Sequence, residues 1–178
     1  MQPDAFVERL AAADFGAAFN FYRDGEGAGV RRARLRRYLA ERAAAPLLLV
    51  GEAPGYRGAR ISGIPFTSER QLTGSGQAEA TATIVHRALT ELGLDHDVLL
   101  WNVLPAHPHL PGRPCTNRRP TRAEIDAGRP FLDELARGRR VVAVGRVAGA
   151  ALGLPSIRHP ARGGGSAFRH GLDELRAS

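Results

Sequence analysis

The chain has 178 residues, of which 43% are hydrophobic and 24% are charged, as expected for a single soluble globular domain covering residues 1–178. No apolar run approaches the roughly 20 residues of a membrane span, and no secretory signal is visible, so we expect a cytoplasmic protein. The only cysteine, Cys115, excludes an internal disulfide and any metal or cluster site built from cysteines alone. The net charge is +7 and all 25 basic residues are arginines; the excess of positive charge favours a polyanionic partner such as nucleic acid.

The first 45 residues predict two helices separated by a glycine-rich loop. Apolar residues from Phe6 to Phe19 give residues 4–22 a hydrophobic face. Residues 30–45 carry five arginines, at 31, 32, 34, 36 and 37, around a narrower apolar stripe. We interpret these arginines as a solvated basic face rather than as a base-reading helix.

The rest of the chain alternates between apolar strands and helices. Strands are predicted at 47–50, 97–103, 140–145 and 156–158, with a long loop at 51–76. Thr121 and Glu124 have the spacing of a capping box, which predicts that a helix follows them. Strands without polar alternation indicate a parallel sheet covered by helices on both faces. The predicted helices of this region cover residues 77–93, 122–137 and 166–176.

Polar side chains follow each predicted strand. They are Glu52, Asn102, Arg146 and His159. Because ligand sites of parallel α/β sheets lie beyond the carboxyl ends of the strands, a carboxylate, an amide and an imidazole are expected to converge there. Each residue alone also has an ordinary structural explanation, such as a loop carboxylate or a turn asparagine.

Four short motifs in a fixed order resemble the uracil-DNA glycosylase superfamily. They are GEAPG at 51–55, GIPF at 63–66, WNV at 101–103 and HP at 159–160. Residues 117–148 also resemble the middle segment of the bacterial and archaeal GEAPG-type glycosylases, and the resemblance spans about residues 46–175. It implies a three-layer α/β/α sandwich with a central, mostly parallel four-stranded sheet.

The resemblance also implies a chemistry, in which a nucleotide is flipped out of DNA and its N-glycosidic bond is hydrolysed. Glu52 would orient the attacking water, His159 would stabilise the departing base, and Asn102 would read the polar edge of uracil. Phe66 would stack on the flipped base. The expected base-binding residues are Gly51, Ala53, Gly55, Tyr56, Gly58, Phe66 and Asn102.

The glycine-rich loop 159–171 resembles the element with which this superfamily enters the minor groove. Its glycines permit close backbone approach, while its arginines could meet phosphates. The expected DNA-binding residues are Arg158, Arg162, Gly163, Gly164, Arg169 and His109.

Three departures from the family pattern bear on function. The best-known GEAPG enzymes hold an iron–sulfur cluster on four cysteines, so this chain is expected to carry no cluster, no metal and no other cofactor. The histidine motif reads HPA, where HPS is usual. Acidic residues that follow GEAPG in the cluster-bearing relatives are replaced here by Tyr56, Arg57 and Gly58.

The third departure leaves the substrate open. Gly58 would leave room beside the pyrimidine C5 position, whereas Tyr56 would close it. The alternatives are therefore uracil or a bulky 5-substituted pyrimidine, including the glucosylated 5-hydroxymethylcytosine of phage DNA. The leading hypothesis is a monomeric, monofunctional DNA glycosylase. It would hydrolyse the bond without forming a Schiff base with lysine, since the chain has no lysine. A protein that binds a modified base without cutting, and a relative that bonds covalently to the abasic sugar through a loop histidine, remain as alternatives.

Overall fold

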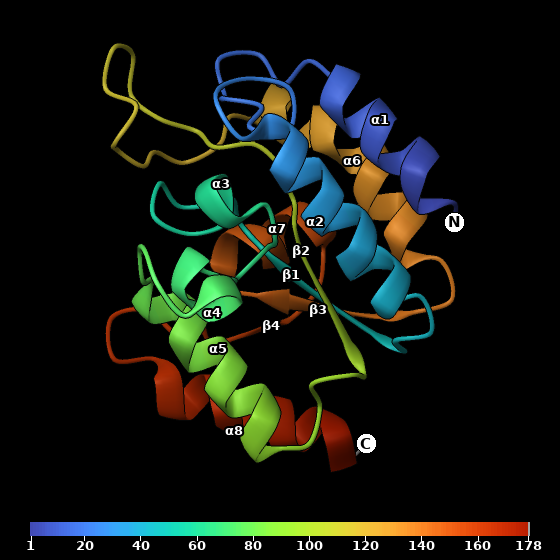
Figure 1. The fold of residues 1–178 in the computed structure, drawn as a ribbon. Coiled ribbons are helices and arrows are strands. Elements are labelled where there is room, and N and C mark those ends of the chain that lie inside the picture. The colour runs from blue at the N-terminus through green and yellow to red at the C-terminus, as the bar shows by residue number, and fades with distance from the viewer. Residues whose placement is uncertain (178) are drawn as a thin grey trace.

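A computed structural model describes residues 1–177 and is built around one parallel sheet (Figure 1). Its four strands lie in the order β2-β1-β3-β4, and every neighbouring pair is parallel. The predicted α/β fold with a mostly parallel four-stranded sheet is therefore confirmed. The strands are β1 (Leu47–Gly51), β2 (Val98–Asn102), β3 (Arg140–Val144) and β4 (Ser156–Ile157).

Helices cover both faces of the sheet and complete three layers (Figure 1). One layer contains α1 (Pro3–Ala12), α2 (Ala28–Glu41) and α6 (Arg122–Ala136). The opposite layer contains α5 (Ala80–Glu91) and α8 (Gly165–Ala177). The helix α7 (Arg146–Leu152) connects β3 to β4. Among the described residues, none of the helices is both long and apolar enough to cross a membrane.

Burial of apolar side chains against the central strands explains this arrangement. Trp101 on β2 is fully buried and meets the ring of Phe6 from α1 edge-on, with 5.6 Å between ring centroids. Phe6 in turn contacts Phe131 of α6, again at 5.6 Å. On the other side, Phe168 of α8 is fully buried. Strands that are apolar on both faces thus require two helical layers, as the sequence predicted.

The first predicted helix, 4–22, is wrong in its second half. The helix ends at Ala12, and residues 13–22 form turns instead. The cause is Asn20, which is buried and donates through Nδ2 to the carbonyl oxygens of Leu10, Ala11 and Ala13. The side chain of Asn20 thus binds carbonyl groups at the end of α1, where the helix itself supplies few donors; the Leu10 carbonyl also accepts from the N–H of Ala13.

Two further predictions are corrected by the structure. The long loop 51–76 contains the short helices α3 (Ala59–Ser62) and α4 (Glu69–Thr73). The helix predicted at 77–93 begins only at residue 80, so Glu79 stands at its N-cap position. The capping box of α6 is confirmed, because Thr121 accepts from the N–H of Glu124 and the Glu124 side chain accepts from the N–H of Thr121.

Candidate active site

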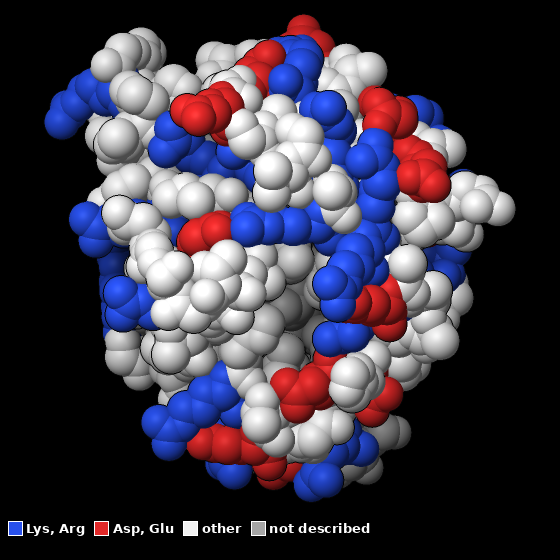
Figure 2. Space-filling view, viewed as in Figure 1, with Lys and Arg blue, Asp and Glu red and all other residues white. Residues whose placement is uncertain are grey.

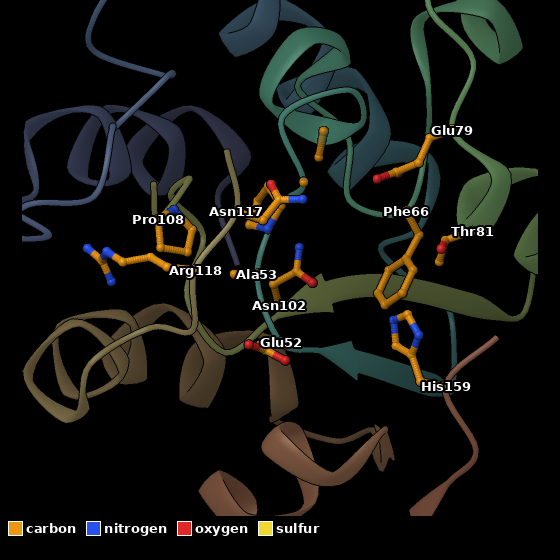
Figure 3. Close-up of a pocket in the computed structure, with 13 residues that line it drawn as sticks. Glu52, Ala53, Phe66, Glu79, Thr81, Asn102, Pro108, Asn117, Arg118 and His159 are labelled. Atoms are coloured by element: carbon orange, nitrogen blue, oxygen red, sulfur yellow. The ribbon is translucent and has the colours of Figure 1, made fainter. Parts of the chain in front are cut away.

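A cavity of about 260 Å³ opens beyond the carboxyl ends of β1 and β2 (Figure 3). Three of its residues, Glu52, Asn102 and His159, come from the strand ends where the sequence analysis placed a site. Parallel register explains why they meet, since Gly51 pairs with Asn102 across β1 and β2. The cavity is lined by Glu52, Ala53, Pro54, Gly55, Ala59, Phe66, Glu79, Thr81, Asn102, Pro108, Asn117, Arg118 and His159.

Asn102 presents an unused amide to this cavity. The residue is only 4% exposed, yet its side chain makes no hydrogen bond with any described residue. Its polar atoms remain accessible through the cavity, unlike Nε1 of Trp101, which is buried without a hydrogen-bond partner among the described residues. The donor and the acceptor of Asn102 are therefore both available to a ligand in the cavity.

His159 follows β4, and its tautomer is set by the main chain. The N–H of Ala161 donates to Nδ1 at 3.1 Å, so the ring proton of the neutral imidazole lies on Nε2. Burial lowers the pKa of His159, and the charge of Arg158 lowers it further, so the ring is neutral at pH 7. The side chain thus offers one N–H donor to the cavity. Ala161 stands where the histidine motif of the family usually has serine, and it contacts His159 through its backbone N–H rather than through a side chain.

Glu52 directly follows β1 and is half-buried. Its backbone is held by the N–H of Leu104, which donates to the Glu52 carbonyl at 3.2 Å. Burial raises the pKa of the Glu52 carboxyl, and the positive charge of Arg119 opposes part of that rise. A carboxylate in this position can attract a cation or take a proton from a water molecule.

The ring of Phe66 forms one side of the cavity. Phe66 adopts a left-handed backbone conformation with φ of 53°, which is unusual for a residue other than glycine. A Cβ atom at Gly51 would collide with this ring and would lie 2.8 Å from Oδ1 of Asn102, so glycine is required there. The close approach of β1 to the ring fixes the aromatic face beside the amide.

Side-chain hydrogen bonds hold the loop that carries Phe66. Ser62 Oγ donates to the carbonyl of Thr67 at 2.6 Å, and Thr67 Oγ1 lies 2.9 Å from Nε2 of His86. His86 belongs to α5, so the loop is fastened to a helix of the sandwich. This fastening stabilises the strained conformation at Phe66.

Sequence reasoning missed the rest of the lining. Glu79 and Thr81 come from the start of α5, and Asn117 and Arg118 come from the proline-rich loop after β2. Within that loop, His107 is buried and contacts the carbonyl of Pro54 through Nδ1 at 2.9 Å. The loop is thereby attached to the GEAPG segment. No local sequence pattern marks these residues, since they reach the cavity only through tertiary packing.

Three predicted base-binding residues do not line the cavity. Gly51 lies behind Phe66. The N–H of Tyr56 donates to Oδ1 of Asn117 at 3.1 Å, and the Tyr56 ring lies beneath the guanidinium of Arg57. Gly58 is buried and packs against the Glu79 side chain. The remaining predicted residues, Ala53, Gly55, Phe66 and Asn102, do line it.

A wider cleft of about 870 Å³ shares Glu52 and His159 with the cavity. Its rim is basic. Four of its arginine side chains make no hydrogen bond or ion pair with the described residues, so their charges are available to an anionic ligand. These four are Arg119, Arg146, Arg158 and Arg162.

The arginines of α2 are different, although they are denser in the sequence. Figure 2 shows arginine and acidic side chains next to one another over this helix. Arg34 pairs with Glu69 at 2.8 Å, and Arg31 donates to the Phe21 carbonyl. All five α2 arginines have such partners within the protein, and Arg31 is buried, so the face predicted to be solvated is in part a packed, hydrogen-bonded one.

The other predicted DNA-binding residues lie outside the cleft. Arg169 is on α8 in an ion pair with Glu91 at 3.1 Å. His109 stacks on His107, with ring centroids 5.8 Å apart. A Cβ atom at Gly164 would collide with the His159 carbonyl, so this glycine permits the turn that follows the histidine, and its neighbour Gly163 is exposed.

The described residues hold no group of three histidine, cysteine, aspartate or glutamate side chains that could bind a metal ion. The polar groups of the cavity include two carboxylates (Glu52 and Glu79), the Asn102 amide and the His159 imidazole, and Thr81, Asn117 and Arg118 add a hydroxyl, an amide and a guanidinium group. Such a set suits recognition of a planar polar ring and attack on a carbon beside it.

Comparison with known proteins identifies the family of the chain and a solved structure with the same fold. The family model of the uracil DNA glycosylase superfamily matches residues 40–171, and the chain belongs to that superfamily. None of the curated proteins compared with the chain matches it. Among solved structures, the crystal structure of wild-type SMUG2 from Pedobacter heparinus is similar, with a TM-score of 0.69. The two chains are 13% identical, and the match covers 99% of this chain and 98% of the other, so the likeness shows a common fold.

Proposed function

We propose that the protein is a monofunctional DNA glycosylase that flips a uracil nucleotide into the cavity and hydrolyses its N-glycosidic bond. The observation that carries this proposal is the convergence of Glu52, Asn102 and His159 around one cavity, with the Asn102 amide unpaired. Membership of the superfamily supports the general activity. The choice of uracil rests on the donors and acceptors of the cavity.

Base recognition would use three side chains. The flipped ring stacks on Phe66, whose face is exposed to the cavity. The Asn102 amide can accept from N3–H and donate to O4, the pattern that distinguishes uracil from cytosine. His159 donates through Nε2–H to the O2 carbonyl, which is the role available to a neutral ring with its proton on that nitrogen.

Bond cleavage would divide charge between two sides of the nucleotide. The C1′–N1 bond breaks, its electron pair moves onto the base, and a cation develops on the sugar. The Glu52 carboxylate stabilises this cation and orients a water molecule, from which it takes a proton as the C1′–O bond forms. His159 stabilises the anionic base by hydrogen bonding. An abasic site and free base are the products, without any lysine adduct, since the chain has no lysine.

The basic cleft would hold the DNA strand on either side of the flipped nucleotide. Arg158 and Arg162 flank His159 in the sequence, and Arg119 and Arg146 face them from other elements. Their unpaired guanidinium groups supply phosphate contacts that position the strand without reading its sequence. We leave Arg169 out of this surface because Glu91 already pairs with it.

Within the superfamily we assign the chain to the GEAPG-type branch without an iron–sulfur cluster. The GEAPG turn at 51–55 supports the branch, and a single cysteine in the sequence supports the lack of a four-cysteine cluster. The proposed reaction requires no cofactor, because the nucleophile is water and the charges are stabilised by side chains.

The size of the cavity bears on the alternative substrates. At about 260 Å³ it lies below the roughly 300–1,000 Å³ of pockets for drug-sized ligands. This volume suits a single base, and uracil is the preferred substrate for that reason. Because Glu52 and His159 also line the wider cleft of about 870 Å³, the excision panel below decides between uracil and a glucosylated base.

The test is excision by the purified protein on end-labelled oligonucleotides, scored by alkaline cleavage at abasic sites. The panel contains uracil in single strands and opposite guanine or adenine, thymine, hypoxanthine and glucosylated 5-hydroxymethylcytosine. We expect uracil to be released and thymine to be retained. Glu52→Gln should reduce release by about 10²–10⁴-fold without weakening DNA binding.

Other outcomes identify the other hypotheses. Binding without release by either form would indicate a base-recognising protein that does not cut. A DNA–protein adduct that survives denaturing electrophoresis would indicate covalent capture of the abasic sugar. Release of the glucosylated base alone would contradict uracil as the substrate.

A further inference from the structure

A second groove, of about 590 Å³, lies between the start of α6 and the helix α7. It joins the basic cleft, because Arg119, Arg146 and Val147 line both. The cleft in turn shares Glu52 and His159 with the cavity. The three hollows therefore form one continuous path that leads from the cavity, past the unpaired arginines, to the groove between the two helices.

Apolar side chains from both helices form the floor of the groove. Val147, Ala150 and Ala151 are spaced at i, i+3 and i+4 on α7, so they share one face of that helix. Ile125 supplies the floor on the α6 side. Ile125 and Val147 are half-buried and Ala150 is exposed, so this floor is open to a ligand.

The sides of the groove are positively charged. Arg119 and Arg146 make no hydrogen bond or ion pair with the described residues through their side chains. Arg122 pairs with Asp126 at 2.9 Å, but both of these side chains are exposed, so the pair is weak and easily exchanged. The described residues that line the groove include no acidic side chain. The groove therefore attracts an anion that also has an apolar surface.

An unpaired nucleotide has both of these properties. Its phosphate is negatively charged, and its base exposes a flat face that can pack on aliphatic side chains and on guanidinium planes. A paired nucleotide presents its phosphate but keeps its base stacked inside the duplex. The groove has more than twice the volume of the cavity, which suits one base, so a nucleotide fits into it.

We propose that the groove between α6 and α7 is a second nucleotide-binding site, which takes an unpaired nucleotide from the same DNA strand as the flipped one. The inference rests on the proposed function, because the cavity defines where the strand starts. From there the phosphates follow the basic cleft to Arg119 and Arg146, and an unstacked base lies on Val147 and Ala150. Since the groove lies to one side of the cavity, only the nucleotides on one side of uracil reach it.

The first test measures binding to DNA without uracil, so that the readout does not depend on cleavage. Fluorescence anisotropy compares a single-stranded oligonucleotide with a blunt duplex of the same length. Ala150→Glu places a carboxylate on the exposed floor and should raise the ratio of Kd for the single strand over the duplex about 10-fold. Val147→Ser removes apolar contact without adding charge and should raise this ratio by a few-fold.

The matched control for the added charge is Ala123→Glu. Ala123 is exposed on α6, close in sequence to Arg122, but it does not line the groove. This variant should leave the ratio of the two Kd values unchanged. Equal ratios for Ala150→Glu and Ala123→Glu would overturn the inference, since added charge alone would then explain the effect.

The second test uses excision to trace the path of the strand. Duplexes with one uracil near an end are either blunt or extended by a single-stranded overhang on the 5′ or the 3′ side of the uracil strand. One overhang should raise kcat/KM about 10-fold over the blunt duplex, and the other should not. Ala150→Glu should remove the increase, and Ala123→Glu should retain it.

The two tests separate this inference from the proposed function. Selective loss of single-strand binding in Ala150→Glu, without release of uracil by the wild type, would support the groove and contradict the glycosylase proposal. Release of uracil with equal effects of the two overhangs would contradict the groove and leave the glycosylase proposal intact. Wild-type binding by both Ala150→Glu and Val147→Ser would show that the groove does not bind DNA.

Discussion

The cavity has two walls of different origin. The sheet-edge wall consists of Glu52, Asn102 and His159, which follow β1, β2 and β4. The loop wall consists of Phe66, Glu79 and Thr81, which come from the segment between β1 and α5. Parallel strand pairing positions the first wall, whereas side-chain hydrogen bonds and glycine contacts position the second.

This difference assigns separate tasks to the two walls. Strand ends are rigid, so groups that must lie within a fraction of an ångström of the reacting bond are best placed there. In the proposed function the loop wall would contact the face of the base through Phe66. Substitutions in the sheet-edge wall should therefore reduce the rate, and substitutions in the loop wall should change how tightly the base binds.

The largest effect is expected for Glu52→Gln. Removing the carboxylate that activates water should reduce single-turnover excision by about 10²–10⁴-fold. DNA affinity, measured by anisotropy, should be equal or higher, because a negative charge is lost near the phosphates. The exposed Glu26→Gln serves as the control. Turnover within a few-fold of the wild type would remove Glu52 from the catalytic residues.

A somewhat smaller loss is expected for the two donors of the sheet-edge wall. His159→Ala and Asn102→Ala should each lower the excision rate by about 10²–10³-fold, the cost of removing one preorganised donor. His170→Ala, at an exposed position on α8, is the matched histidine control. Normal rates for either variant would contradict its assignment.

The pH dependence of the rate should follow Glu52. Its pKa is raised by burial, and the reaction needs the deprotonated form, so the rate should fall about 10-fold per pH unit below that raised pKa. The acidic limb of the profile should have a midpoint above the ordinary glutamate value. It should persist in His159→Gln and vanish from the residual rate of Glu52→Gln. Persistence of the limb in Glu52→Gln would assign it to another group.

In the loop wall, Phe66→Ala should weaken base binding more than it slows the chemical step. Stacking of one base on an aromatic ring contributes about 1–3 kcal/mol, so KM should rise roughly 10-fold with a smaller change in kcat. Phe66→Tyr keeps the ring and should keep the KM. An unchanged KM in the alanine variant would mean that the base does not stack on this ring.

The smallest effects are expected for the arginines. The double variant Arg158→Ala and Arg162→Ala should reduce the slope of log K against log salt by about 1 for each lost phosphate contact. The control pair on α2, Arg36→Ala and Arg37→Ala, should leave the slope unchanged because both side chains have acidic partners within the protein. An equal change for the two pairs would mean that intramolecular pairing does not decide which arginines bind DNA.

The sheet-edge wall could be predicted from the sequence because its position depends on strand ends alone. Once residues 47–50 and 97–103 are interpreted as parallel strands, Glu52 and Asn102 must lie at one edge. The capping box at Thr121 is equally local, and the structure confirms it.

The loop wall could not be predicted in this way. Glu79 reaches the cavity because helix α5 begins at residue 80, a few residues later than predicted, and because Gly55 and Gly58 leave room for its carboxylate. The end of α1 was missed for a similar reason, since Asn20 satisfies carbonyls seven to ten residues before it. Both cases depend on contacts between segments, which apolar periodicity does not encode.

The most direct test of the central claim is a mass balance on a duplex with a single uracil opposite guanine. Free uracil is quantified by mass spectrometry, and abasic sites are counted in the same reaction by an aldehyde-reactive probe. The account predicts equal amounts of the two products from the wild type, and about 10²–10⁴-fold less of both from Glu52→Gln at the same early time point. Retention of uracil in the DNA by the wild-type protein, with binding intact, would contradict it.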